Sequence, residues 1–118
     1  MMDYKRADRV SDLLKKEIAQ TLIKEIKDPR IGLVTVTDVE VTDDLRLARV
    51  FFSMVGSNRE REETTKGLDS ASSFIKRTLG KRLRMRFIPD IVFKFDSSLE
   101  YGSHIDSLLD NLKTPVSD

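Results

Sequence analysis

The residues best suited to chemistry in this chain are cations, and they are concentrated in one short segment. Residues 76–86 contain no acidic side chain and six basic ones, namely Lys76, Arg77, Lys81, Arg82, Arg84 and Arg86. The whole chain is nearly neutral, with 21 Lys and Arg against 20 Asp and Glu. A block of positive charge in a nearly neutral protein creates a local field that favours a polyanion. The segment is therefore a candidate phosphate-binding surface, although an ordinary solvated helix face explains a basic run equally well.

Groups that could perform catalysis or bind a metal are scarce. The chain has one histidine, His104, and no cysteine, so a metal site would need clustered carboxylates. We expect His104 to be a surface residue at the edge of a short helix. The adjacent Asp43 and Asp44 do not converge on one pocket, because neighbours on a strand point to opposite faces. No glycine-rich loop has the spacing of a nucleotide cradle. We therefore expect no enzyme activity, no metal and no cofactor.

Length and composition indicate one compact domain. The chain has 118 residues, 39% of them hydrophobic, which matches one domain with a core. No apolar run approaches the roughly 20 residues that span a bilayer, and the first residues lack the apolar stretch of a signal peptide. The absence of cysteine fits a reducing compartment. We expect a cytoplasmic monomer without membrane contact, with a domain at 1–112 and a polar tail at 113–118.

The first half of the chain predicts a helix followed by a β-hairpin. Apolar residues recur every four positions from Lys5 to Ile26, which favours an amphipathic helix, and this helix should end by Lys27 or Asp28 because Pro29 follows. Residues 33–42 and 48–54 alternate in the manner of strands, with Asp43-Asp44 at the hairpin tip. The apolar phase changes between Val36 and Val39, and a regular strand cannot absorb this change. We therefore expect a β-bulge near Thr37-Asp38.

The second half predicts a long helix, a third strand and a short final helix. Residues 60–83 have a helical apolar stripe, but the serine-rich cluster at 70–73 lowers the helix propensity. A kink or a break is therefore expected at this cluster. Residues 87–95 read as a strand with Phe87 on the same face as the later apolar residues, and a short helix is expected at 105–112. These elements favour an α+β domain, with a three-stranded sheet and helices on one of its faces.

The basic segment falls at the end of the second expected helix. At 100° per residue, Arg77, Lys81 and Arg84 cluster on the side opposite the apolar stripe, with Lys76 at the border. Arg82 would point inward on a regular helix, unless its stem extends outward or the helix loosens before it. Arg86 lies in the connection to the third strand. Such a row suits the phosphates of a nucleic-acid backbone, and an acidic protein partner is the alternative.

Several short segments add a resemblance to a known family. They include Arg6-x-x-Arg9-Val10, Lys27-Asp28-Pro29-Arg30, Val36-Thr37-Asp38-Val39, Phe74-Ile75-Lys76-Arg77 and the run from Leu83 to Ser98. Each segment alone is weak, but their order and spacing are specific. Together they resemble bacterial ribosome-binding factor A from about residue 4 to residue 112.

This resemblance implies a fold and a role. The implied fold is a type II KH-like domain in which an Ala-x-Gly kink replaces the usual Gly-x-x-Gly loop. Here the matching residues are Ala71, Ser72 and Ser73, so a serine stands at the glycine position. The implied role is that of a non-enzymatic factor that binds the immature 30S small ribosomal subunit and its 16S rRNA near the decoding region. It would support late 30S maturation, processing of the 5′ end of the rRNA and cold adaptation.

The basic segment and the resemblance indicate the same surface. We expect RNA contacts from all six cations of residues 76–86, and we expect the backbone at Ala71–Ser73 to lie near RNA. Arg6 and Arg9 are secondary candidates, and pairing with Asp8, Asp12 or the acidic C-terminal residues is an equally good interpretation of these two arginines. A protein adaptor that uses the basic helix face on an acidic partner is the alternative function.

Overall fold

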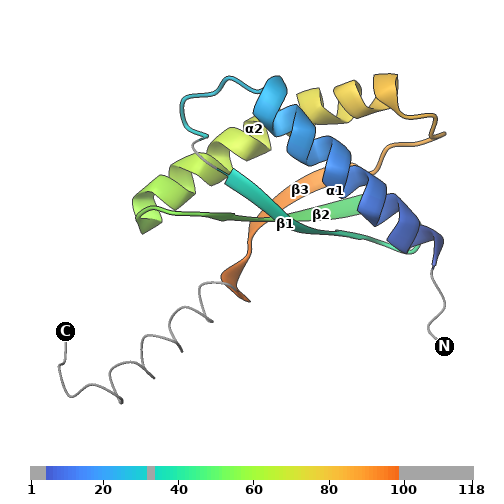
Figure 1. Ribbon diagram of the computed structural model, residues 1–118, viewed down its shortest axis with the longest axis horizontal. Coiled ribbons are helices and arrows are strands. Elements are labelled where there is room, and N and C mark those ends of the chain that lie inside the picture. The colour runs from blue at the N-terminus through green and yellow to red at the C-terminus, as the bar shows by residue number, and fades with distance from the viewer. Residues whose placement is uncertain (1–4, 32–33, 99–118) are drawn as a thin grey trace, which may run out of the picture.

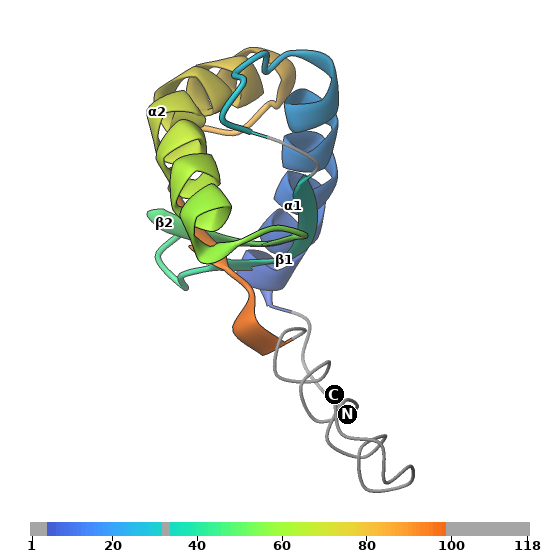
Figure 2. The same ribbon diagram turned by 90° about the vertical axis from the view of Figure 1, so that its left-hand side faces the viewer.

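The computed structural model describes residues 5–31 and 34–98, and they form two layers. The elements are α1 (Arg6–Lys24), β1 (Val34–Val41), β2 (Leu47–Met54), α2 (Asn58–Arg82) and β3 (Asp90–Phe95). Both helices cover the same face of the sheet (Figures 1 and 2). The expected α+β class and the implied element order are therefore confirmed. The helix expected at 105–112 and His104 lie outside the described residues.

The sheet is mixed, with strand order β1-β2-β3. β1 and β2 pair antiparallel, whereas β2 and β3 pair parallel. Parallel neighbours need a long crossover, and α2 provides it. The β1–β2 register shifts between Val36 and Asp38, which confirms the expected bulge. The extra residue, Thr37, donates a hydrogen bond of 2.6 Å from its hydroxyl to the carboxylate of Asp96.

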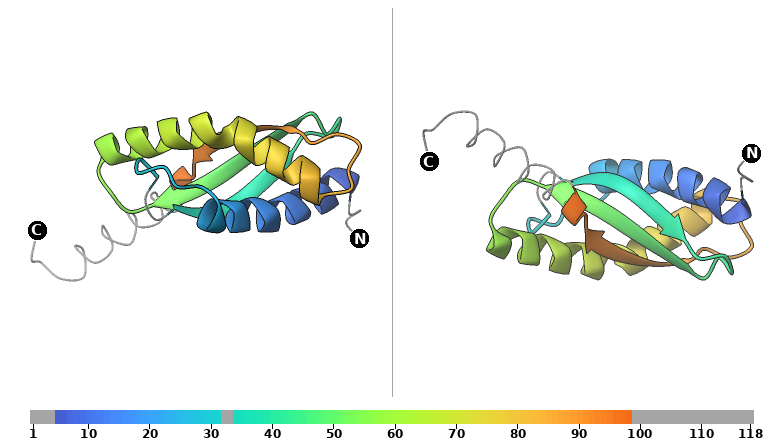
Figure 3. Two further views of the ribbon diagram at one scale, coloured as in Figure 1. Left: turned by 90° about the horizontal axis from the view of Figure 1, so that it is seen from above. Right: turned by 90° about the horizontal axis from the view of Figure 1, so that it is seen from below.

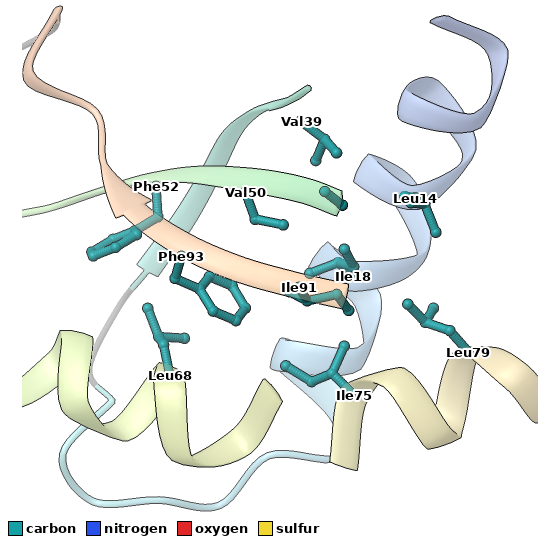
Figure 4. Close-up of a cluster of buried hydrophobic side chains, with 11 residues drawn as sticks. Leu14, Ile18, Val39, Val50, Phe52, Leu68, Ile75, Leu79, Ile91 and Phe93 are labelled. Atoms are coloured by element: carbon teal, nitrogen blue, oxygen red, sulfur yellow. The ribbon is translucent and has the colours of Figure 1, made fainter. Parts of the chain in front are cut away.

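The core lies between the sheet and the two helices. Figure 4 shows side chains from all three strands and both helices meeting there. Its members are Leu14, Ile18, Val39, Ala48, Val50, Phe52, Leu68, Ile75, Leu79, Ile91 and Phe93, each at most 8% exposed. Ile75 and Leu79 come from the same part of α2 as the basic segment, so their burial fixes which side of that helix faces the solvent.

α2 is a single helix of 25 residues that changes direction near its middle (Figure 3). The expected kink is therefore a bend in a continuous helix, and the helix does not break into two. In this middle part, the Ser72 hydroxyl donates to the carbonyl of Asp69 at 2.8 Å. Side-chain bonds of this kind compete with the helical ladder and favour bending.

The connection from α2 to β3 differs from the sequence prediction. β3 begins at Asp90 and not at residue 87, and the Phe87 side chain is 69% exposed. Pro89 explains the late start, because it has no N–H to donate to a neighbouring strand. At the start of β3, the backbone N–H of Asp90 donates a hydrogen bond to the carbonyl of Arg46 at 2.9 Å. Phe87 was therefore wrongly placed on the inner face of the sheet.

Candidate nucleic-acid interface

The C-terminal half of α2 presents two cations to the solvent. Ile75 and Leu79 are fully buried on the side that faces the sheet. Arg77 and Lys81 lie on the opposite side, and both are exposed. Within the described residues, neither side chain makes an ion pair or a hydrogen bond. The sequence prediction of an exposed cationic side on this helix is confirmed for these two residues.

Arg84 is also exposed and unpaired among the described residues, but it does not belong to the helix. α2 ends at Arg82, and Leu83 has an extended backbone with φ −100° and ψ 141°. The expectation that Arg84 continues the helical row was therefore wrong. We call Arg77, Lys81 and Arg84 the unpaired cations. They follow one another along the end of α2 and the start of the connection to β3.

Two other cations of the basic segment are paired with carboxylates. The ammonium of Lys76 lies 2.6 Å from a carboxylate oxygen of Asp90, which joins α2 to the start of β3. The guanidinium of Arg82 pairs with Glu25, directly after α1. Arg82 is the last residue of α2, so its side chain is able to turn away from the core and reach Glu25. Both ion pairs are substantially exposed, and such pairs contribute only about 0–1 kcal/mol.

The sixth cation, Arg86, lies against an aromatic ring. Its guanidinium carbon is 5.5 Å from the centroid of Phe87, within the range of a cation–π contact. Arg86 occupies the connection, as the sequence predicted, and it is exposed. The contact leaves the arginine charge available, because a ring does not neutralise it.

Arg6 and Arg9 lie at the beginning of α1, on a different element from the basic segment, and both are exposed. The start of α1 and the connection from α2 to β3 are found at the same end of the molecule (Figures 1 and 3). Arg9 already has an interaction partner. Acidic groups share this end, since Lys5 lies 3.9 Å from Asp43 at the hairpin tip. The two arginines remain secondary candidates.

The residues of the expected kink lie in the bent part of α2. Ala71 and Ser72 are half-buried, and Ser73 is exposed. Ser72 makes the bond to Asp69 described above, so its hydroxyl has an internal partner. A role of this backbone near RNA stays a prediction.

The motif Lys27-Asp28-Pro29-Arg30 is a structural turn. The carboxylate of Asp28 accepts hydrogen bonds from the side chain and the backbone N–H of Arg30, with a shortest distance of 2.6 Å. These bonds lower the pKa of Asp28 and raise the pKa of Arg30. The carbonyl of Arg30 accepts from the Thr64 hydroxyl at 3.0 Å, which ties the turn to α2. The motif thus follows the end of α1 and contains an ion pair between Asp28 and Arg30.

Two exposed phenylalanines beside the cations were not predicted as site residues. Phe74 is 39% exposed on α2, and Phe87 is 69% exposed in the connection. Phe74 lies outside the apolar stripe that contains Ile75 and Leu79, so the helical pattern could have predicted that Phe74 is exposed. For Phe87, the indication was Pro89, two residues later, which delays the start of β3 and leaves Phe87 outside the strand.

The described residues contain neither a candidate metal site nor a membrane-spanning helix. They contain no group of three or more His, Cys, Asp or Glu side chains able to hold a metal ion. None of the helices within residues 5–31 and 34–98 is long and apolar enough to cross a membrane.

Comparisons with known proteins match most of the chain to one family. The ribosome-binding factor A family model matches residues 6–109. Ribosome-binding factor A of Syntrophus aciditrophicus is 52% identical over 112 residues, covering 95% of this chain and 91% of that protein. The Geotalea daltonii protein of the same name is 47% identical over 115 residues, covering 98% and 94%.

Solved structures give the same result. The crystal structure of ribosome-binding factor A from Thermus thermophilus has a TM-score of 0.67 and 28% identity, covering 75% of this chain and 93% of that chain. A Thermus thermophilus model fitted into a cryo-EM map of a 30S–RbfA complex has a TM-score of 0.63 and 28% identity, covering 79% and 97%. The sequence match and the shared fold together lead to one conclusion: the chain belongs to the ribosome-binding factor A family.

Proposed function

We propose that this protein binds the immature 30S subunit and its 16S rRNA through the basic segment. In this role it supports late 30S maturation, processing of the 5′ end of the rRNA and growth in the cold. It acts in the cytoplasm without chemistry of its own and is a monomer away from the ribosome. The observation that carries the proposal is the set of unpaired cations, Arg77, Lys81 and Arg84. Family membership, and the Thermus relative fitted into a 30S complex, support it.

The binding mechanism is electrostatic. Each phosphate that a cation neutralises releases condensed counterion, and the logarithm of the binding constant falls by about 0.7–0.9 per phosphate for each unit of log salt. Three such contacts give a contribution of about −2 to −3 to the slope. The protein assists maturation if its affinity for the immature particle exceeds that for the finished one, because a ligand shifts an equilibrium only by its differential affinity.

The paired cations contribute less than the unpaired ones in this mechanism. Lys76 and Arg82 must exchange a carboxylate for a phosphate when RNA binds. The exchange has a small cost, because exposed ion pairs contribute only about 0–1 kcal/mol. We therefore rank the unpaired cations first, Arg86 next, and Lys76 and Arg82 last.

The test removes the unpaired cations together, as Arg77→Ala, Lys81→Ala and Arg84→Ala. Binding to immature 30S particles is measured by sedimentation over a series of salt concentrations. We expect weaker binding and a salt slope that is shallower by about 2–3. The matched control, Lys15→Ala with Lys66→Ala and Lys94→Ala, removes the same charge from exposed positions elsewhere.

Two results would contradict the proposal. Binding of the first triple variant as tight as that of the parent would show that the basic segment is not the contact surface. An equal loss in the control variant would show that net charge alone matters. Nuclease treatment of a pull-down distinguishes RNA from an acidic protein partner, because a contact made through RNA is lost and a direct protein contact persists.

A further inference from the structure

Two exposed phenylalanines, Phe74 at 39% and Phe87 at 69%, lie close to the unpaired cations in the sequence. Phe74 comes three residues before Arg77 and seven before Lys81, and residues at these spacings share one face of a helix. Its ring is 39% exposed, although the adjacent Ile75 is fully buried. Phe74 therefore begins a line along α2 in which an aromatic ring is followed by two cations.

Phe87 is brought to the other end of this line by the connection from α2 to β3. Ile88 packs against the core and Pro89 is fully buried. A β-carbon placed on Gly80 would lie 3.8 Å from Cγ1 of Ile88, so this connection lies against the last turns of α2. The burial of Ile88 and Pro89 leaves Phe87 pointing outward, with Arg86 against its ring.

This combination has a defined ligand chemistry. Cations alone suit the backbone of any nucleic acid, whether single-stranded or double-stranded. Exposed aromatic rings next to cations suit unpaired bases, because a base in a duplex already has both of its faces covered by neighbours. We propose that Phe74 and Phe87 stack on unpaired bases, so that the basic segment recognises single-stranded RNA in preference to duplex RNA. This inference rests on the proposed function and specifies the RNA that it requires.

The first experiment compares affinities for two RNAs. The double variant Phe74→Leu with Phe87→Leu keeps apolar side chains but removes both rings. Anisotropy measures its binding to a fluorescein-labelled, unstructured oligoribonucleotide and to a labelled RNA duplex of the same length. We expect an affinity for the single strand at least about fivefold below that of the parent, since stacking contributes about 1–3 kcal/mol per base. Affinity for the duplex and the salt slope should not change.

A matched control is available on the far side of the sheet. Phe51 is half-buried next to the fully buried Phe52, and neighbours on a strand point to opposite faces. Phe51→Leu makes the same substitution away from α2 and should leave affinity for the single strand unchanged.

The second experiment uses the absence of tryptophan from the chain. Phe74→Trp and Phe87→Trp each introduce a single fluorophore that retains a stacking face. We expect the single strand to quench both, whereas Phe51→Trp should keep its emission. The Trp variants should also bind the single strand as tightly as the parent.

Each outcome separates the inference from the proposed function. If the double leucine variant binds the single strand like the parent, or if the parent prefers the duplex, stacking is refuted and the proposed function stands. Unquenched tryptophans at both positions would refute stacking as well. If the double leucine variant binds the single strand more weakly than the parent, but removal of the unpaired cations does not change binding to 30S particles, the proposed electrostatic contact is refuted and the stacking proposal is supported.

Discussion

The two glycines in the interior of α2, Gly67 and Gly80, should respond in opposite directions to replacement by alanine. Gly67 is buried where the turn at residues 28–31 crosses the helix. A β-carbon there would lie 2.9 Å from Cγ1 of Ile31 and 3.2 Å from Cβ of Arg30. At Gly80 the nearest atom would be Cγ1 of Ile88, at an ordinary contact distance of 3.8 Å.

The expected magnitudes follow from these distances. Alanine in place of glycine in a helix interior gains up to about 1 kcal/mol. Overpacking of a tightly packed site costs about 1–3 kcal/mol. Gly80→Ala should therefore stabilise the protein by up to about 1 kcal/mol. Gly67→Ala should lower the free energy of unfolding by between zero and about 2 kcal/mol. The two variants should therefore differ in stability by about 1–3 kcal/mol.

Urea and thermal unfolding measure this difference directly. For a chain of this size, 1 kcal/mol corresponds to a shift of about 4 °C in Tm. Gly67→Ala should destabilise the protein less in an Ile31→Ala background than in the parent, because contacting residues show coupling in a double-mutant cycle. If Gly67→Ala stabilises the protein as much as Gly80→Ala does, the turn does not pack against α2 at this position and the reasoning is refuted.

Three further predictions concern stability. Ser57→Ala removes the N-cap of α2, whose hydroxyl accepts from the N–H of Glu60 at 3.1 Å, and should cost about 1 kcal/mol in urea unfolding; an unchanged urea midpoint would count against the cap. Leu79→Ala empties a fully buried site and should cost about 2–5 kcal/mol, which thermal unfolding would detect as a clear fall in Tm; a fall no larger than that of an exposed substitution would contradict the burial. Hydrogen bonds to the Asp96 carboxylate, the larger effect from Ser98 and the smaller from Thr37, hold the pKa of Asp96 below its usual range. A lowered pKa in the folded state stabilises the protein above the unfolded-state pKa, and this contribution is lost as pH falls through the folded-state pKa. The stability difference between the parent and Asp96→Asn should therefore shrink in acid unfolding series below about pH 4, and a difference that is constant from neutral pH into acid would refute this role.

Local patterns predicted most of the fold because each depends on residues close together in the chain. The change of apolar phase between Val36 and Val39 predicted the bulge, since only an extra residue keeps both valines on the helix-covered face. The predicted position of Phe87 was wrong for a related reason. Its hydrophobicity fits the strand pattern, but Pro89 delays the strand; Pro89 is fully buried and the partly buried Ile88 packs against the core instead.

The candidate site was predicted less completely, because its electrostatics depend on distant partners. No local pattern could pair Arg82 with Glu25, which precedes it by 57 residues. The pairing of Lys76 with Asp90 likewise requires the return of the chain into β3. α2 ends at Arg82, within one residue of the predicted end, and Arg84 therefore lies outside the helix although its spacing fits the cationic side. The division into paired and unpaired cations is thus a property of the tertiary structure.

The direction of α2 has a consequence for how this surface holds an anion. A helix carries partial positive charge at its N-terminus and partial negative charge at its C-terminus, and many proteins use the amides of an N-terminus to grip phosphate. Here the cations lie in the C-terminal half of α2 and just after it, where the last turn of the helix offers carbonyl oxygens that repel an anion. The electrostatic attraction must therefore come from the side chains and not from the backbone amides of a helix N-terminus. In the proposed role, such a surface would conform to an irregular RNA strand and release it one contact at a time.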